Sequence, residues 1–371
     1  MEFDKFSFSL LKSSDNSRLG IINTPRGSVD TPAFMPVGTQ ATVKGVFIDD
    51  IIKTGSQIIL SNTYHLMLRP GVERISSSGG LHNFMNCKLP ILTDSGGFQV
   101  MSLSKLNKID RKKGAIFQSH IDGREYILSP EESIRVQKGL NSDILMVMDE
   151  CPKKTNDYEK IKLSMNLSTE WALRSKNEFG INSKKALFGI IQGGIYKDLR
   201  EESIAFNEDK LNTFGIAIGG SLGSNKHEMQ EVVNFTASRL KNFRPVHLLG
   251  IGDPLDIWSF VDQGIDTFDC VSPTRLARHG SALVRGKKGK INLKNAKYKD
   301  QLVPIDSQCL CYTCQTFTLS YIYHLFAAQE LLAMQLLTNH NIYFMNNLMK
   351  IIRKAIKENN FETVKKAWFE S

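Results

Sequence analysis

Short runs of apolar residues recur along the chain, and each run ends in small or polar residues. Because the apolar positions within a run are nearly continuous rather than alternating, both faces of each predicted strand are expected to be buried. This is typical of a parallel sheet covered by helices. Eight runs fit this description, at residues 33–39, 57–63, 90–97, 143–151, 187–194, 214–220, 246–253 and 267–272.

Polar segments with helical spacing separate these runs. In "SPEESIRVQKGLN" (129–141), Ser129 is a suitable N-cap and Pro130 stands at the first helical position. The segment "KHEMQEVVNFTASRLKN" (226–242) is a second example. Eight such units predict an α/β fold, the (β/α)8 or TIM barrel. A doubly wound open sheet is the alternative, and the closed barrel suits the count better.

The ends of the chain differ from these repeating units. We predict that residues 1–30 form a small antiparallel sheet, a hairpin ahead of the first barrel strand, in a position to close the bottom of the barrel. A length of 371 residues exceeds the usual domain of about 100–200, yet a TIM barrel with insertions reaches it. We therefore predict one catalytic domain over residues 1–371 with an appended subdomain.

The amino-acid composition is typical of a soluble globular protein rather than a membrane or secreted protein. Hydrophobic residues make up 41% of the chain and charged residues 23%, which is ordinary for a soluble globular protein. No stretch approaches the roughly 18 consecutive apolar residues of a membrane helix, and the first residues lack the layout of a signal peptide. We expect no membrane partner and a cytoplasmic location.

The net charge of +9 is unevenly distributed. Residues 281–299 hold seven Lys or Arg and no acid, and a second basic stretch covers residues 104–114. Both stretches are explained equally well as solvated, mobile loops or as a surface for a polyanion, because each cation that neutralises a phosphate releases a counterion. Charge alone does not decide between them.

Three of the six cysteines, Cys309, Cys311 and Cys314, fall within six residues, so they do not form a secreted disulfide framework. A predicted helix over residues 319–341 follows and contains His324 and His340. Three thiolates and one imidazole make a closed, tetrahedral zinc site of the structural kind. Spacing alone leaves the histidine open, although a lone histidine inside a helix, such as His324, is more often a partly buried side chain.

Polar residues gather at the predicted strand ends, where the chemistry of TIM barrels takes place. A single aspartate at such a position is often a helix cap, but polar residues on several strands at once favour a shared site. Asp94 and Asp269 end the third and eighth strands. The residues at these ends are Asp94, Ser95, Asp149, Gln192, Gly219, Gly220 and Asp269.

The motifs "TDSGGFQVMSL", "DEC", "IIQGG", "FDCVSPTR" and "CLCYTC" with a later histidine occur in this order between residues 34 and 347. Together they resemble the tRNA-guanine transglycosylases, also called queuine tRNA-ribosyltransferases. The resemblance implies exchange of a guanine in the tRNA anticodon for a 7-deazaguanine without breaking the phosphodiester backbone. It also implies a homodimer, and a TIM barrel with an inserted zinc-binding subdomain, here at about residues 285–345.

Base exchange with retained configuration at the ribose C1′ requires two displacements and a covalent intermediate, as in retaining glycosidases. By resemblance Asp269 is the nucleophile and Asp94 is the general acid/base. Cys270 is then a packing neighbour. A thioglycoside would turn over poorly, and a free thiol with a pKa of about 8.5 is mostly protonated near neutrality.

The resemblance also implies the remaining site residues. The substrate-binding set is Asp94, Ser95, Asp149, Cys151, Gln192, Gly219, Gly220 and Ser221. Arg275 and Arg278 resemble contacts to the anticodon loop, and Lys287 and Lys288 in the basic stretch would follow nearby phosphates. One structural Zn²⁺ per subunit is expected on Cys309, Cys311, Cys314 and His340.

These observations favour a bacterial-type pentosyltransferase that inserts 7-aminomethyl-7-deazaguanine (preQ1) at the wobble guanosine. The chain departs from bacterial relatives at residues 221–225, where they usually have Leu at 221 and Gly-Glu at 224–225, and at Asp253 and His279. A preference for queuine or an archaeosine precursor is therefore one alternative. A non-catalytic RNA-binding paralogue is disfavoured because both carboxylates are present, and a zinc hydrolase because the strand ends lack an open metal site.

Overall fold

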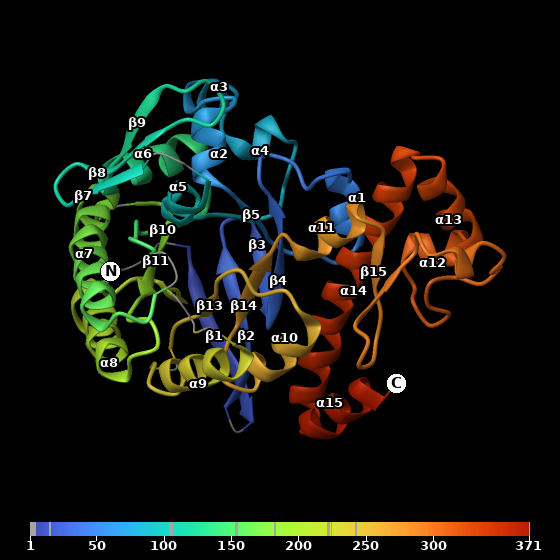
Figure 1. The fold of residues 1–371 in the computed structure, drawn as a ribbon. Coiled ribbons are helices and arrows are strands. Elements are labelled where there is room, and N and C mark those ends of the chain that lie inside the picture. The colour runs from blue at the N-terminus through green and yellow to red at the C-terminus, as the bar shows by residue number, and fades with distance from the viewer. Residues whose placement is uncertain are drawn as a thin grey trace.

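The computed structural model describes residues 5–370 apart from residues 15, 104–106, 153–154, 182, 221–222, 224 and 242. Within these residues, eight parallel strands form a closed barrel (Figure 1). The barrel closes because β14 pairs with β4 and β10 pairs with β6. Its strands are β4 (Ala33–Gly38), β5 (Ile59–Ser61), β6 (Ile91–Thr93), β10 (Ile144–Met146), β11 (Ala186–Ile191), β12 (Gly215–Ile218), β13 (Val246–Leu248) and β14 (Thr267–Cys270).

Every predicted apolar run contributes one of these strands, and closure rules out the open doubly wound sheet. Several strands are shorter than predicted. The run at 143–151, for example, is a strand only over Ile144–Met146. Asp94, Asp149 and Gln192 directly follow or lie beyond the last strand residue of their runs, whereas Asp269 is still within β14.

Helices surround the barrel, and their starts follow local capping chemistry. Ser129 Oγ accepts a hydrogen bond from the Glu132 backbone N–H at 3.1 Å with Pro130 at the first helical position, which confirms the predicted start of α6. These helices are α1 (Ile48–Lys53), α2 (Thr63–Leu68), α3 (Val72–Ser77), α4 (Leu81–Phe84), α5 (Gly97–Leu103), α6 (Pro130–Leu140), α7 (Tyr158–Phe179), α8 (Lys197–Ala205) with a π-helical continuation (Phe206–Leu211), α9 (Lys226–Ala237), α10 (Pro254–Val261) and α11 (Ser272–Arg278).

The N-terminal segment is a small antiparallel sheet, as predicted, and it has three strands in the described part of the chain where a hairpin would have two. Its strands are β1 (Ser7–Ser14), β2 (Ser17–Thr24) and β3 (Gly27–Thr31). Arg18 Nη2 lies 3.0 Å from Asp266 Oδ2, and Arg26 Nε lies 3.1 Å from Asp143 Oδ1. Because Asp266 and Asp143 immediately precede β14 and β10, the sheet lies at the end of the barrel where the strands begin.

A second antiparallel sheet, which the sequence analysis missed, covers part of the opposite end. It consists of β7 (Asn107–Asp110), β8 (Gly114–Gln118) and β9 (Glu125–Leu128). Phe117 and Leu128 pack in one cluster with Tyr64, which belongs to α2, and with Met148, which follows β10. The interpretation of residues 104–114 as a mobile loop is therefore wrong for residues 107–110, which form β7; residues 104–106 lie outside the described residues.

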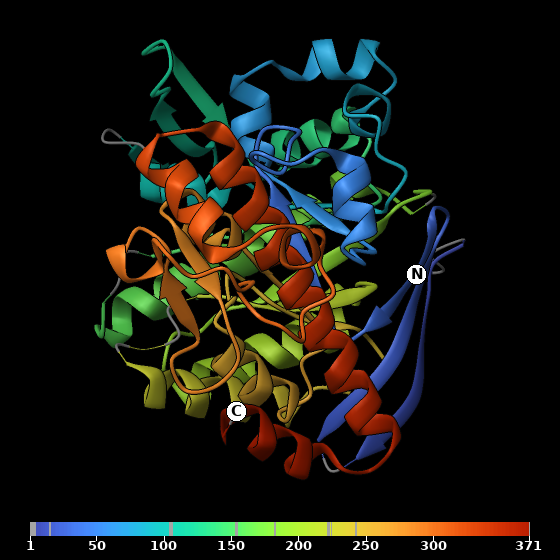
Figure 2. The same cartoon turned by 90° about the vertical axis from the view of Figure 1, so that its right-hand side faces the viewer.

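The C-terminal region forms a subdomain beside the barrel. It contains β15 (Ser281–Leu283), β16 (Lys290–Asn292), a 3-10 helix (Ala296–Tyr298), α12 (Tyr312–Thr316) and α13 (Leu319–Ala327), followed by α14 (Leu331–Lys357) and α15 (Phe361–Glu370). Its buried core includes Leu293, Ile322 and Leu336, whereas Phe344 and Leu348 of α14 pack into the barrel cluster. Helix α14 therefore joins both parts, and Figure 2 shows its lower end beside the N-terminal strands, where Lys12 Nζ donates to Lys357 O at 2.7 Å.

The predicted single helix over residues 319–341 is wrong, because the chain breaks between α13 and α14. Gln329 has a φ of 58°, in the left-handed region. Its N–H donates to Phe326 O at 3.2 Å, and the N–H of Glu330 donates to Leu325 O at 2.9 Å. These two bonds are a Schellman motif, which usually has glycine at the left-handed position. Among the described residues, none of the helices is both long and apolar enough to span a bilayer.

Candidate active site and metal centre

Three buried polar side chains meet where β6, β10 and β11 end. Ser95 Oγ donates to Asp149 Oδ1 at 3.1 Å, and Gln192 Nε2 donates to Asp149 Oδ2 at 2.7 Å. Their strands are neighbours in the barrel, so the structure brings these predicted residues into one wall of a shared site. Each carboxylate oxygen has two lone pairs, so Asp149 retains capacity to accept N–H groups from a ligand.

Burial raises the pKa of Asp149 to about 6, and the neighbouring Glu150 carboxylate adds to the rise while the hydrogen bond from Ser95 opposes it. A carboxylate kept in such surroundings destabilises the folded state at neutral pH. It is typical of a group retained for binding or catalysis rather than for stability.

The next wall is formed by glycines after β12. A Cβ on Gly220 would lie 2.5 Å from Gln192 Oε1, and the φ of +79° is unfavourable for any other residue. Behind this turn lies Arg200, whose side chain is buried and donates to Gly219 O at 3.0 Å and to Gly194 O at 2.8 Å. Arg200, which was not predicted as a site residue, thus holds the turns after β11 and β12 together.

Asp94 follows β6 and directly precedes Ser95 of the wall formed with Asp149 and Gln192. Its Oδ1 accepts from the Thr63 backbone N–H at 2.9 Å, and its Oδ2 accepts from Asn62 Nδ2. Burial raises the pKa of Asp94 to about 6, against the lowering effect of these hydrogen bonds, and the Asp269 carboxylate contributes to the rise. Asn62 and Thr63, at the end of the run 57–63, were not predicted as site residues.

Asp269 is the partner carboxylate, on β14. Its Oδ1 accepts from the Gly250 backbone N–H at 3.0 Å and contacts His247 Nε2 at 3.2 Å. Side chains alternate along a strand, so the next residue, Cys270, points the other way and packs against the cluster outside the barrel. Burial raises the pKa of the Cys270 thiol to about 11, so it is protonated at neutral pH, consistent with the predicted packing role.

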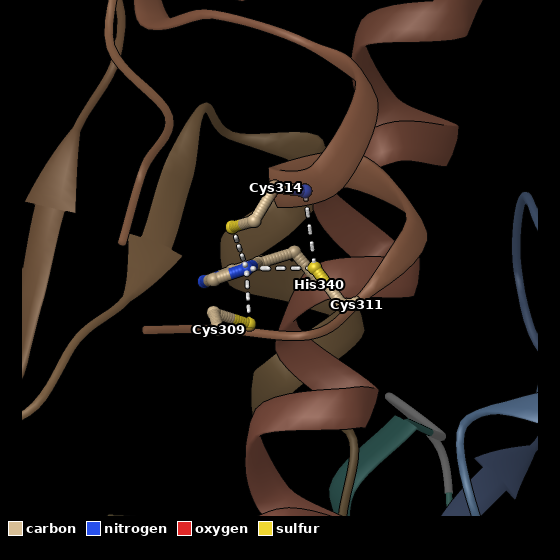
Figure 3. Close-up of side chains that lie close together, drawn as sticks. All are labelled: Cys309, Cys311, Cys314 and His340. Atoms are coloured by element: carbon tan, nitrogen blue, oxygen red, sulfur yellow. Dashed lines mark hydrogen bonds between the residues drawn. The ribbon is translucent and has the colours of Figure 1, made fainter. Parts of the chain in front are cut away.

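A second centre lies in the C-terminal subdomain, where Cys309, Cys311, Cys314 and His340 are all buried with their ligand atoms within 4.8 Å of one another. Figure 3 shows the sulfur atoms around the imidazole of His340. Their distances to its Nδ1 are 3.8, 3.4 and 3.3 Å for Cys309, Cys311 and Cys314 respectively. In a tetrahedral site with the usual zinc–sulfur and zinc–nitrogen bonds this edge measures about 3.5 Å, so the group fits a metal ion.

The outer contacts of His340 complete this centre. Its Nε2 lies 2.8 Å from Leu283 O, so this nitrogen carries the proton and leaves the Nδ1 lone pair for a metal. His340 lies in the middle of α14 rather than at the end of a helix, because the predicted helix over residues 319–341 is in fact two separate helices, α13 and α14. His324 is exposed on α13 and takes no part, which corrects its interpretation as a partly buried side chain.

Comparison with known proteins identifies the family of the chain. The family model described as queuine tRNA-ribosyltransferase matches residues 13–371. The chain belongs to this family. It is 48% identical to the queuine tRNA-ribosyltransferase of Thermoanaerobacter sp. (strain X514) over 96% of this chain and 95% of that protein. The corresponding protein of Halothermothrix orenii is 48% identical over 95% and 94% of the two chains, and that of Cereibacter sphaeroides 47% over 95% and 93%. The chain is thus an enzyme of the transglycosylase type, as its motifs predict.

Positions where the chain departs from the usual motifs of the queuine tRNA-ribosyltransferases have local roles. Asn225 and Asp253 are N-caps, which accept from the backbone N–H groups of Glu228 at 3.0 Å and Leu255 at 2.9 Å. His279 directly follows α11. The predicted substrate residue Ser221 lies outside the described residues, as do residues 222 and 224 of the same loop. Cys151 is half-buried near Asp149, and burial raises the pKa of its thiol.

The basic residues predicted to bind RNA lie on α11 and on the turn between β15 and β16. Arg275 is exposed on α11, which follows directly from β14 and therefore from Asp269. Arg278 is half-buried and donates through Nη1 to Thr274 O at 3.0 Å. Lys287 and Lys288 are exposed in the turn. The first pair is close in sequence to the candidate nucleophile, whereas the second belongs to the subdomain.

Asp149→Asn is expected to make the protein more stable at neutral pH than the wild type. The pKa of Asp149 is about 6 in the folded state and about 3.9 in the unfolded state. Its contribution to the free energy of unfolding is therefore complete below about pH 4 and is lost as the pH rises through about 6. Relative to the variant, the free energy of unfolding of the wild type should fall by on the order of 2 kcal/mol as the pH rises through this range. Urea unfolding of both proteins at pH 4.5 and 7.5 measures the difference. A constant difference would contradict the burial argument, and comparison with the variant cancels other effects of pH.

Proposed function

We propose that the chain exchanges the wobble guanine of a tRNA anticodon for preQ1 through a covalent aspartyl-ribose intermediate. The observation that carries the proposal is that Asp94 adjoins the Ser95–Asp149–Gln192 wall and is close enough to Asp269 for that carboxylate to raise its pKa. Two carboxylates of unequal environment are what a retaining exchange at an anomeric carbon requires. The choice of preQ1 follows the resemblance to bacterial relatives.

The environments of the two carboxylates support different roles. Both oxygens of Asp94 accept hydrogen bonds, and its pKa of about 6 suits a group that releases and takes up a proton near neutral pH. Asp269 is held through Oδ1 alone, and the described residues give Oδ2 no hydrogen bond. An oxygen without a donor is the better nucleophile, so Asp269 attacks and Asp94 handles protons.

The proposed reaction has two balanced displacements at the ribose C1′. In the first, a carboxylate oxygen of Asp269 bonds to C1′ as the C1′–N9 bond breaks, and the departing guanine takes a proton from Asp94. In the second, Asp94 accepts the N9 proton of the incoming base, which bonds to C1′ and releases the Asp269 carboxylate. Two inversions restore the original configuration.

Base recognition is assigned to the wall around Asp149. An ionised Asp149 accepts hydrogen bonds from the ring N–H and the exocyclic amine of a guanine-like base, a charge-assisted pair. Gln192 and the Gly220 N–H form hydrogen bonds with the remaining polar atoms on the edge of the base. Gly219 and Gly220 leave room for the backbone to approach the ring. The cluster of Cys309, Cys311, Cys314 and His340 is proposed to hold structural Zn²⁺, which fastens residues 309–314, here called the metal loop, to α14.

Arg275→Ala is expected to weaken binding of the tRNA anticodon stem-loop about 3- to 10-fold at moderate salt, since an exposed cation next to the site neutralises a phosphate. The salt dependence of log K should become shallower by about 0.7 per lost contact. Fluorescence anisotropy over a salt series measures both. Lys210→Ala, which removes an exposed cation shortly before β12, at the end of the barrel where the strands begin, should change neither. An unchanged slope for Arg275→Ala would remove this residue from the interface.

We also propose that the chain acts as a homodimer, as the family resemblance implies. A cavity of about 420 Å³ between α1, the metal loop and α14 supports this, because apolar side chains around it face solvent. Phe47 is 76% exposed, Leu310 72% and Tyr312 61%. Apolar patches of this kind often mark contacts between proteins.

Incubation with unmodified tRNA and radiolabelled guanine tests the proposed activity. Label should enter the tRNA, and unlabelled preQ1 should displace it irreversibly. Binding of tRNA without incorporation would instead favour a non-catalytic RNA-binding paralogue. If guanine is exchanged but preQ1 does not inhibit the exchange, the result would support the mechanism and favour queuine or an archaeosine precursor as the incoming base.

A further inference from the structure

One polar side chain in contact with the site has no role in the proposed reaction. His247 on β13 is fully buried, and its Nε2 lies 3.2 Å from Asp269 Oδ1. Its Nδ1 lies 2.9 Å from Thr267 Oγ1. Both ring nitrogens of a buried histidine are therefore occupied, one by the hydroxyl of a strand residue and the other by the candidate nucleophile.

The strand register explains this arrangement. His247 pairs directly with Thr267 across the β13–β14 ladder, so their side chains share the inner face of the barrel. Asp269 is two residues beyond Thr267 and points to the same face. The intervening residue Phe268 belongs to the outer cluster. Thr267 and Asp269 thus flank the imidazole at positions that follow from the backbone and do not depend on loop conformation.

The hydrogen-bond donors can be assigned from the chemistry of the groups. An ionised carboxylate only accepts, so Nε2 of His247 must carry a proton and donate to Asp269 Oδ1. The Thr267 hydroxyl can both donate and accept, so it pairs with Nδ1 on the other side of the ring. The Gly250 N–H is a second donor to the same oxygen, at 3.0 Å. Two donors on one oxygen fix the plane of the carboxylate.

We infer that His247 is a positioning residue for the nucleophile, and that Oδ2 of Asp269 is the oxygen that bonds to C1′. This inference rests on the proposed function. Oδ1 is bound by His247 and Gly250, whereas Oδ2 accepts no hydrogen bond from the described residues. In the first displacement Oδ2 supplies the electron pair to C1′, and the C1′–N9 pair leaves with the base. In the covalent intermediate Oδ1 becomes the carbonyl oxygen of the ester and still accepts from His247.

Because the reacting carboxylate must be pre-oriented, loss of the donor should act on the rate more than on binding. His247→Asn places an amide near the position of Nδ1, within reach of Thr267, but it is too short to reach Asp269. His247→Gln extends an amide to the position of Nε2 and retains a donor to Oδ1. These two variants separate the loss of the hydrogen bond from the loss of a buried polar side chain.

The experiment measures kcat and KM for tRNA in guanine exchange, the rate of covalent adduct formation in one turnover, and the melting temperature. His247→Asn should lower kcat and the adduct rate about 10- to 100-fold, the usual effect of one hydrogen bond to a charged group, with KM little changed. His247→Gln should restore most of the loss. Thr267→Val, which removes the hydroxyl that holds Nδ1, should reduce kcat by a smaller factor.

Three outcomes would overturn the inference. The first is a folded His247→Asn variant that reacts at the wild-type rate. The second is a folded His247→Gln variant that is as slow as His247→Asn. If His247→Asn does not fold, the third is a Thr267→Val variant that reacts at the wild-type rate. Asp269→Asn is measured alongside to separate the inference from the proposed function. Exchange by that variant would refute the proposed nucleophile, whereas an inactive Asp269→Asn beside a fully active His247→Asn refutes the role of His247 alone.

Discussion

Asp269→Asn is expected to abolish base exchange, with a loss of at least about 10³-fold, because removal of a nucleophile leaves only binding and electrostatic contributions. The asparagine preserves the shape of the side chain and can keep an oxygen directed at the Gly250 N–H, so folding and tRNA affinity should change little. Label incorporation into tRNA and a denaturing gel for the covalent adduct measure the two effects.

The matched control is Cys270→Ser, at the next position on β14. The thiol packs outside the barrel and its raised pKa keeps it protonated, so the serine variant should exchange bases at nearly the wild-type rate. An adduct that persists in Asp269→Asn and disappears in Cys270→Ser would assign covalent catalysis to the cysteine and contradict the proposed mechanism.

Cys311→Ser is expected to lose most of the bound metal and to destabilise the fold. The four ligands are buried, and Cys311 Sγ also accepts a hydrogen bond from the Cys314 backbone N–H at 3.3 Å. The metal centre therefore holds the loop with the three cysteines against α14. Structural zinc contributes folding free energy directly, and the melting temperature should fall by about 5 °C or more. Metal analysis of the purified protein and thermal unfolding measure both quantities.

The control for this variant is His324→Ala, which removes the exposed histidine of the same subdomain. It should keep both its metal and its melting temperature. A Cys311→Ser variant with full metal content would exclude this thiolate as a ligand. Equal metal loss in His324→Ala would mean that the fourth ligand is not His340.

The barrel could be predicted from the sequence because its strands are buried on both faces and read as continuous apolar runs. The run at 187–194, for instance, covers all of β11 except Ala186, and every residue of this strand is buried. The parallel arrangement also brought Ser95, Asp149 and Gln192 together, since consecutive strands end at the same edge. The approximate location of these residues thus followed from topology, and their hydrogen bonds did not.

Other features carry no such signal. The strands β7–β9 have only four or five residues each and are separated by polar turns, so they form no continuous apolar run. The break before α14 depends on a glutamine in a conformation that glycine usually adopts. Asn62 and His247 gain their roles only through contacts with Asp94 and Asp269, which are distant in sequence. Arg200 lies on a helix whose polar pattern suggests a solvated face, yet its guanidinium is buried under the turns that it holds.

The most direct test of the proposed mechanism is to locate the bond between protein and RNA. The protein is mixed with unmodified anticodon stem-loop without free base, denatured, digested and analysed by mass spectrometry. We predict a nucleotide attached to the peptide that contains Asp269, with the guanine lost. Attachment to Asp94 or Cys270, or base exchange at the normal rate with no attached nucleotide, would contradict the proposal.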